Sequence, residues 1–119
     1  MKSTLIIDPR IRTKKIDLVE PPVVIRVNHF DDRAAKNFAI DMSDAHNSGQ
    51  SIIPVVIDSY GGQVHSFLAM AAEIESSSLP VATICIGKAM SAGAMLLACG
   101  TEGYRYASPD SVIVNNPLP

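Results

Sequence analysis

One serine stands in a turn of small residues, where its hydroxyl could act as a nucleophile. The turn reads Gly87-Lys-Ala-Met-Ser91-Ala-Gly93 and follows an apolar run. We predict that Ser91 begins a helix, where free N–H groups and the helix dipole favour a developing negative charge. A serine at this point would also serve as an ordinary helix cap with close helix–sheet packing, so the turn alone leaves both interpretations open.

A second glycine-rich turn, Asp58-Ser-Tyr-Gly61-Gly62, follows the preceding apolar run. Both turns come where a predicted strand ends and a predicted helix begins, which is the usual place for ligands in open α/β sheets. Glycine there permits a positive φ and lets an oxyanion approach the backbone amides closely. The two turns together therefore predict a nucleophile site with an oxyanion hole.

Alternating strand and helix patterns position these turns. Apolar and β-branched runs predict strands at 23–27, 52–58, 81–86, 104–106 and 112–114, and apolar residues at helical spacing predict helices at about 32–47, 63–76 and 91–98. The second helix should bury one face, which carries Val64, Phe67, Leu68, Ala71 and Ile74. Strands that alternate with helices imply an α/β fold with a mostly parallel sheet. We expect an irregular N-terminal segment at 1–22 and one domain at 23–119.

The composition excludes several classes of function. Ten basic and twelve acidic residues leave a formal charge of -2, and no basic stripe supports nucleic-acid binding. No apolar run approaches the roughly 18 residues that span a bilayer, so we expect no membrane association. Cys85 and Cys99 lie in apolar runs, which favours free thiols in a reducing, cytoplasmic compartment.

A series of motifs gives the sequence a more specific interpretation. The turn at 58–62 is followed by Thr83-Ile-Cys-Ile-Gly-Lys-Ala-Met-Ser91-Ala-Gly-Ala and then by Arg105-Tyr-Ala-Ser-Pro-Asp-Ser111. This series closely resembles the proteolytic subunit of the ATP-dependent Clp protease. That family carries Ser-Pro-Gly-Gly, then Thr-Ile-Cys-x-Gly-x-Ala-x-Ser-x-Gly-Ala, then Arg-Tyr-Ala-x-Pro-Asn-Ser. The resemblance covers about residues 23–118 and implies the spiral of β-α-β units shared by the ClpP and crotonase folds.

The resemblance also implies a mechanism and partners. Ser91 matches the nucleophile of a serine endopeptidase, and the backbone N–H groups of Ala92 and of Gly61 or Gly62 match its oxyanion hole. The family cleaves peptides and unfolded proteins inside ring assemblies. The resemblance implies that this chain forms a homo-oligomeric ring and that other ClpP subunits are further partners. A separate Clp ATPase unfoldase consumes the ATP, so we expect no cofactor and no metal in this chain.

The sequence departs from the family at the general base. The family has a histidine just after the last predicted strand, and counting from Ser111 puts this position at Asn116. A carboxamide does not accept the serine proton at neutral pH, and a serine without its base is a poor nucleophile. The triad aspartate belongs beyond Pro119, so we expect a chain shortened at its C-terminus. Two functions stay open: a working ClpP-like peptidase, or a catalytically inactive subunit that assembles with or modulates an active Clp protease.

The sequence offers other candidate bases and one other candidate activity. His65 is expected half-exposed on a helix, and Lys88, three residues before Ser91, is expected to face the solvent rather than form a Ser–Lys dyad. His29 and His46 should lie on the surface. Enoyl-CoA hydratases share the spiral and would bind an acyl thioester, but they lack the Ala-x-Ser-x-Gly-Ala series.

Overall fold

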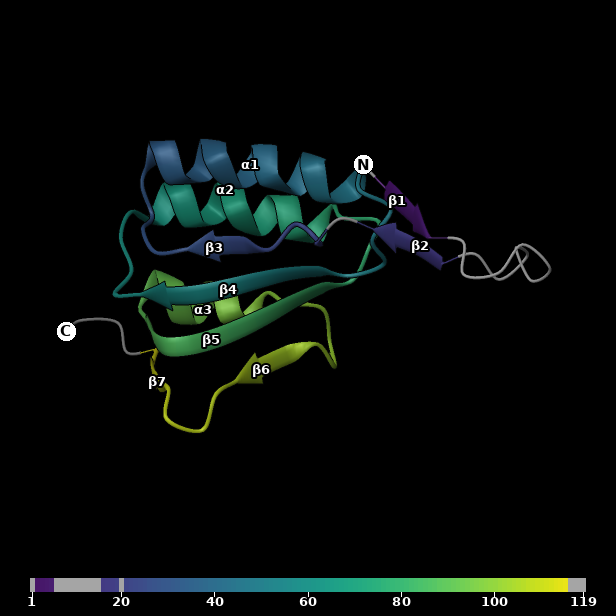
Figure 1. The fold of residues 1–119 in the computed structure, drawn as a ribbon. Coiled ribbons are helices and arrows are strands. Elements are labelled where there is room, and N and C mark those ends of the chain that lie inside the picture. Colours follow the sequence, from purple (N-terminus) through teal and green to yellow (C-terminus); the bar gives the residue numbers. More distant parts are fainter. Residues whose placement is uncertain (1, 6–15, 20, 116–119) are drawn as a thin grey trace.

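The computed structural model describes residues 2–5, 16–19 and 21–115 of the chain (Figure 1). The elements are β1 (Lys2–Leu5), β2 (Ile16–Val19), β3 (Ile25–Val27), α1 (Asp32–His46), β4 (Ile53–Ser59), α2 (Val64–Glu75), β5 (Val81–Met90), α3 (Ala92–Ala98), β6 (Arg105–Ala107) and β7 (Val112–Val114). The order β-α-β-α-β-α-β-β from residue 25 onward confirms the predicted α/β fold.

A parallel sheet forms the centre of the molecule. Its strands lie in the order β3-β4-β5-β6, and β7 pairs with the far part of β5. Every pair in this sheet is parallel. The carboxyl ends of β4 and β5 therefore lie at the same edge, and this edge carries both glycine-rich turns.

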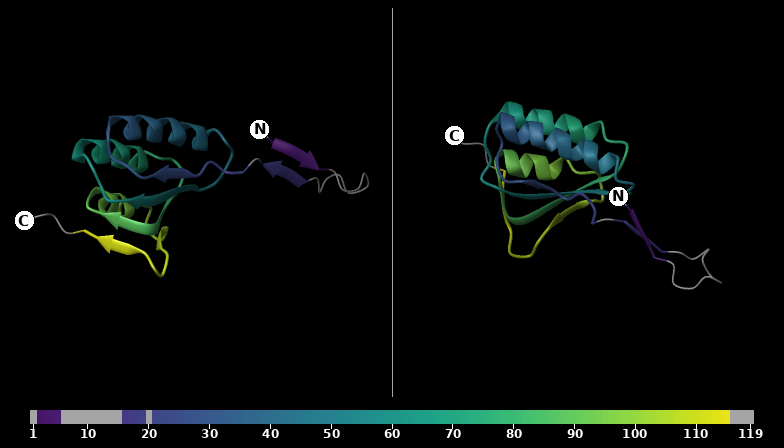
Figure 2. Two further views of the ribbon diagram at one scale, coloured as in Figure 1. Left: turned by 60° about the vertical axis from the view of Figure 1, so that its left-hand side comes forward. Right: turned by 45° about the horizontal axis from the view of Figure 1, so that its top comes forward.

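The three helices cover one face of the sheet (Figure 2). Ile25, Val55 and Thr83 occupy paired positions on β3, β4 and β5, and all three are buried. The next paired row contains Val56 and Ile84, which are only half-buried, and ends in an exposed Tyr106. Burial thus alternates along β3 and β4, because helices pack on one side and the described residues leave the other side uncovered.

The helices follow from caps and apolar spacing. The Asp31 carboxylate accepts a hydrogen bond from the Ala34 N–H at 2.7 Å and begins α1 as predicted. Helix α2 buries Ser66, Phe67, Met70, Ala71 and Ile74. The predicted burial of Val64 and Leu68 is wrong, because these side chains lie at the edge of that stripe and are 62% and 57% exposed.

Two segments differ from the sequence-based prediction. The N-terminal segment, predicted to be irregular, contains the antiparallel strands β1 and β2, which pair with each other. Ile16-Asp17-Leu18 alternates in polarity, and that was the available signal. Strand β5 also continues to Met90, where a turn had been predicted from Gly87, because Lys88, Ala89 and Met90 pair with β7. No helix in the described part of the chain is long and apolar enough to cross a membrane.

Candidate active site

Ser91 has an unusual backbone conformation between β5 and α3. Its φ is 53° and its ψ is -119°, and it is the only non-glycine residue with a positive φ among the described residues. Its N–H donates to the Val114 carbonyl at 2.8 Å, and its own carbonyl accepts from the Met95 N–H at 3.0 Å. A conformation of this kind costs about 1–3 kcal/mol and persists only where the surroundings impose it.

The Ser91 side chain does not act as a helix cap. Ser91 is exposed, and its side chain makes no capping hydrogen bond to α3. The capping interpretation, which the sequence left open, therefore does not account for this serine. Its hydroxyl is free to meet a ligand at the surface.

The two glycine-rich turns lie in contact with each other. Gly61 has a φ of +112°, and a Cβ placed on it would lie 3.1 Å from the Ser91 Cβ and 3.4 Å from the Ala92 nitrogen. No larger residue fits between the turns without displacing one of them. The residues predicted for the nucleophile and the oxyanion hole are thus brought together at one place.

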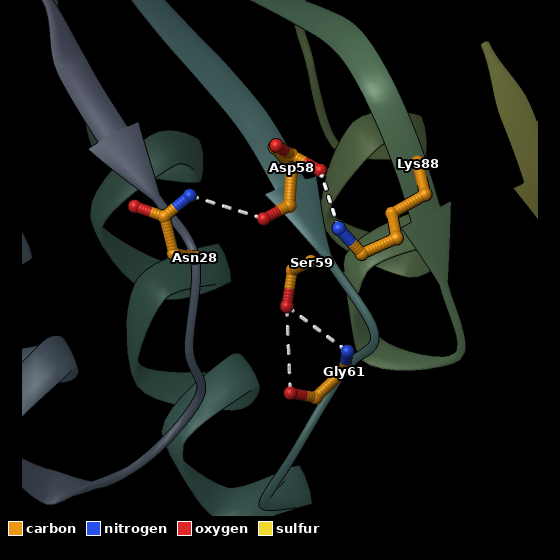
Figure 3. Close-up of polar contacts among 5 residues, drawn as sticks. All are labelled: Asn28, Asp58, Ser59, Gly61 and Lys88. Atoms are coloured by element: carbon orange, nitrogen blue, oxygen red, sulfur yellow. Dashed lines mark hydrogen bonds and ion pairs between the residues drawn. The ribbon is translucent and has the colours of Figure 1, made fainter.

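The backbone N–H groups around Ser91 differ in whether they already have a hydrogen-bond acceptor. The N–H of Gly61 donates to the hydroxyl of Ser59 at 2.9 Å, and Ser59 is buried (Figure 3). Among the described residues, the N–H groups of Gly62 and Ala92 have no acceptor. Gly62 lies tightly against Phe30, since an added Cβ would meet the Phe30 carbonyl oxygen at 2.5 Å.

An ion pair joins residues of the two turns. Lys88 Nζ lies 2.8 Å from Asp58 Oδ1 (Figure 3). It also lies 4.4 Å from the centre of the Tyr60 ring. The hydrogen bond from Lys88 lowers the pKa of Asp58, and the same bond raises the pKa of Lys88. Lys88 therefore stays protonated at neutral pH, which argues against a Ser–Lys dyad. The expectation that Lys88 simply faces the solvent is wrong.

Two of the three histidines contact groups other than Ser91. Exposed His65 places its Nε2 3.1 Å from Asp32 Oδ1 on the neighbouring helix. His46, expected on the surface, is half-buried, and its ring nitrogens lie 2.7 Å from the Met42 carbonyl and 2.9 Å from the Ser77 hydroxyl. His29 is exposed as predicted.

A hollow of about 270 Å³ adjoins the Gly61 turn. It is lined by Asn28, His29, Asp58, Ser59, Tyr60, Gly61 and Lys88. Within the described ranges, no group of three or more His, Cys, Asp and Glu residues could hold a metal ion. The hollow can thus offer hydrogen bonds and a neutralised ion pair to a ligand.

Asn116, the expected position of the general base, lies outside the described residues. The structure adds a second position, because β7 ends at Val114 and Asn115 is the first residue after it. Met90 pairs with Val114 in parallel register, so Ser91 and Asn115 each follow the last paired residue of their strand. Sequence reasoning missed Asn115, and the predicted end of the last strand at 114 was the signal that could have found it.

One comparison with known proteins agrees with this arrangement. A family model described as Clp protease matches residues 14–118. The match covers most of the chain, including both turns and the serine between β5 and α3.

Proposed function

The chain belongs to the Clp protease family, and from this premise we propose that it is a serine peptidase subunit in which Ser91 is the nucleophile. The backbone of Ser91 is the observation that carries the proposal. A strained conformation at φ 53° holds this serine exposed beside Gly61. Strain of this kind is retained where a side chain must be presented to a substrate.

We propose the N–H of Ala92 as one donor of the oxyanion hole and that of Gly61 or Gly62 as the other. The loss of one such donor typically slows acyl transfer by about 10²–10³. Ser59 distinguishes the two glycines, because its hydroxyl binds the Gly61 N–H. If Gly61 is the donor, Ser59→Ala changes the rate at which Ser91 reacts, and if Gly62 is the donor the rate stays unchanged.

A catalytically inactive subunit is the second candidate function. It is favoured by the residues that follow β7, because Asn115 and Asn116 both carry a carboxamide where a base is needed. Lys88 is held by Asp58 and His65 by Asp32, so neither supplies that base in the described structure. Such a subunit would assemble with, or modulate, an active Clp protease.

Assembly and location complete the proposal. We propose that residues 23–119 form one ClpP-like domain that associates into a homo-oligomeric ring in the cytoplasm, with other ClpP subunits and a separate Clp ATPase as partners. The substrate would be a peptide or an unfolded protein. Apolar side chains at the exposed sheet face and edge support association, since Ile86, Tyr106 and Val112 are 50%, 51% and 49% exposed. A stable monomer in light scattering at micromolar concentration would contradict the ring.

A fluorophosphonate probe tests the choice between the two functions. The peptidase predicts labelling of the wild-type chain that Ser91→Ala abolishes, together with cleavage of an unfolded protein such as casein. The inactive subunit predicts no labelling of the wild-type chain. Asn115→His and Asn116→His then locate the base position, because only the histidine that reaches Ser91 raises the labelling rate.

A further inference from the structure

Strand β5 contains a bulge just before the serine turn. Ile57 on β4 pairs with Cys85 on β5, but two residues later Ser59 pairs with Ala89. Asp58 alone therefore faces the three residues at 86–88. Because a bulge bends its strand and shifts the register, this one determines where β5 delivers Ser91 relative to the Gly61 turn.

Asp58 contacts the bulge through its side chain and the neighbouring strand through its backbone. Its Oδ1 lies 2.8 Å from Lys88 Nζ, and its carbonyl accepts a hydrogen bond from Asn28 Nδ2 at 3.1 Å. The carboxylate also lies against Gly87, which has a φ of +94°, and a Cβ there would be 2.8 Å from Oδ1. Glycine at 87 is thus required both by its backbone conformation and by the packed carboxylate.

Lys88 is held from two sides. Besides the ion pair, its Nζ lies 4.4 Å from the centre of the Tyr60 ring, within the range of a cation–π interaction. Tyr60 belongs to the turn that carries Gly61. The Lys88 side chain therefore links the bulge in β5 both to the end of β4 and to the turn that meets Ser91.

We propose that the Asp58–Lys88 ion pair is a positioning device that fixes the β5 bulge and thereby holds Ser91 beside Gly61. The side chains of Lys88 and Asp58 are 27% and 45% exposed. Partly exposed pairs contribute little to global stability, so the effect of this pair is local and concerns the placement of the two turns. Its consequence for catalysis rests on the proposed function of Ser91, whereas its consequence for local structure does not.

Amide hydrogen exchange of Ser91 tests the proposal without any activity. The Ser91 N–H is bound to the Val114 carbonyl, and it exchanges when the bulge and β7 separate. In Lys88→Met and in Asp58→Asn we expect this amide to exchange about tenfold faster, with α1 amides unchanged, because only the local opening becomes easier. Lys88→Arg keeps the charge and should restore most of the protection. Unchanged Ser91 exchange in both charge-removing variants would overturn the proposal.

Labelling kinetics test the same pair in the site. Where the wild-type chain reacts with the fluorophosphonate, Lys88→Met should lower the maximal labelling rate about tenfold with little change in the half-saturating concentration. The double variant Asp58→Asn/Lys88→Met should react no more slowly than either single variant, since both remove one interaction. Multiplicative losses, or an equal loss in Lys36→Met on α1, would refute the positioning role. A wild-type chain that does not react refutes the peptidase function, and the exchange experiment alone then decides the proposal.

Discussion

Replacement of Gly61 by alanine adds only one methyl group, but it should destabilise the fold and displace one of the two turns. The new methyl group would lie 3.0 Å from the Met90 carbonyl oxygen and 3.1 Å from the Ser91 Cβ. Neither atom belongs to the flexible end of a long side chain, so the backbone of one turn must move. The φ of +112° adds strain of its own, because residues other than glycine rarely adopt this backbone conformation.

The magnitude can be separated into two contributions by a matched control. Gly103 also has a positive φ, +87°, but an added Cβ there meets no atom within 4 Å. Gly103→Ala should therefore cost only the conformational strain, about 1–2 kcal/mol. Gly61→Ala adds overpacking of about 1–3 kcal/mol, for a total of about 2–5 kcal/mol. The difference between the two variants measures the contact between the turns.

Urea unfolding followed by circular dichroism measures both variants. The expected result is a lower midpoint for Gly61→Ala than for Gly103→Ala, with similar slopes. Where the wild-type chain reacts with a fluorophosphonate, Gly61→Ala should also react at least about tenfold more slowly than Gly103→Ala, since small displacements of a nucleophile are costly. Equal stability of the two variants would refute the close contact of the turns.

Three further predictions concern buried and charged groups. Thr83→Val removes the buried hydroxyl that donates to the Leu97 carbonyl at 2.7 Å, and should lower the free energy of unfolding by about 1–3 kcal/mol; an unchanged urea midpoint would contradict this. Burial raises the pKa of the Cys85 thiol, so iodoacetamide near neutral pH should modify it only after unfolding, as mass spectrometry can show. The hydrogen bond from Lys88 lowers the pKa of Asp58 below its ordinary 3.8, so the pair has its full local effect above that pH and loses it as the pH falls through the lower value. The ratio of the Ser91 amide exchange rates in Lys88→Met and in the wild-type chain should therefore be constant from about pH 5 to 8 and fall toward one in acid, as Asp58 becomes protonated; a ratio that stays unchanged in acid would count against the pair.

Sequence periodicity predicted the order of the elements from β3 to β7, because each helix and strand has a clear apolar pattern. The side of α2 that is buried was predicted less well. Its stripe runs through Met70, whereas the spacing of Val64 and Leu68 fitted a helical face equally well. Which of two apolar stripes meets the core depends on the neighbouring helices, and local spacing does not contain that information.

The candidate site shows a similar division. The two turns could be placed at one edge of the sheet, since the carboxyl ends of parallel strands lie together. The ion pair between Asp58 and Lys88 could not be predicted from the sequence. It depends on a bulge in which three residues of β5 lie opposite one residue of β4. The positive φ of Ser91 was equally hidden, because it occurs where the Ser91 N–H binds the distant Val114 carbonyl, a contact that local residue types do not reveal.

The hydrogen bond between the Ser91 N–H and the Val114 carbonyl also has a consequence for biosynthesis. The segments up to β5 leave the ribosome before β7 does, since the chain is made from its N-terminus onward. The backbone of Ser91 gains its last partner only when β7 has left the exit tunnel and closed the loop from β5. A nascent chain would therefore carry an incompletely formed serine turn, and any reactivity of Ser91 would arise only after nearly all of the described chain has been made.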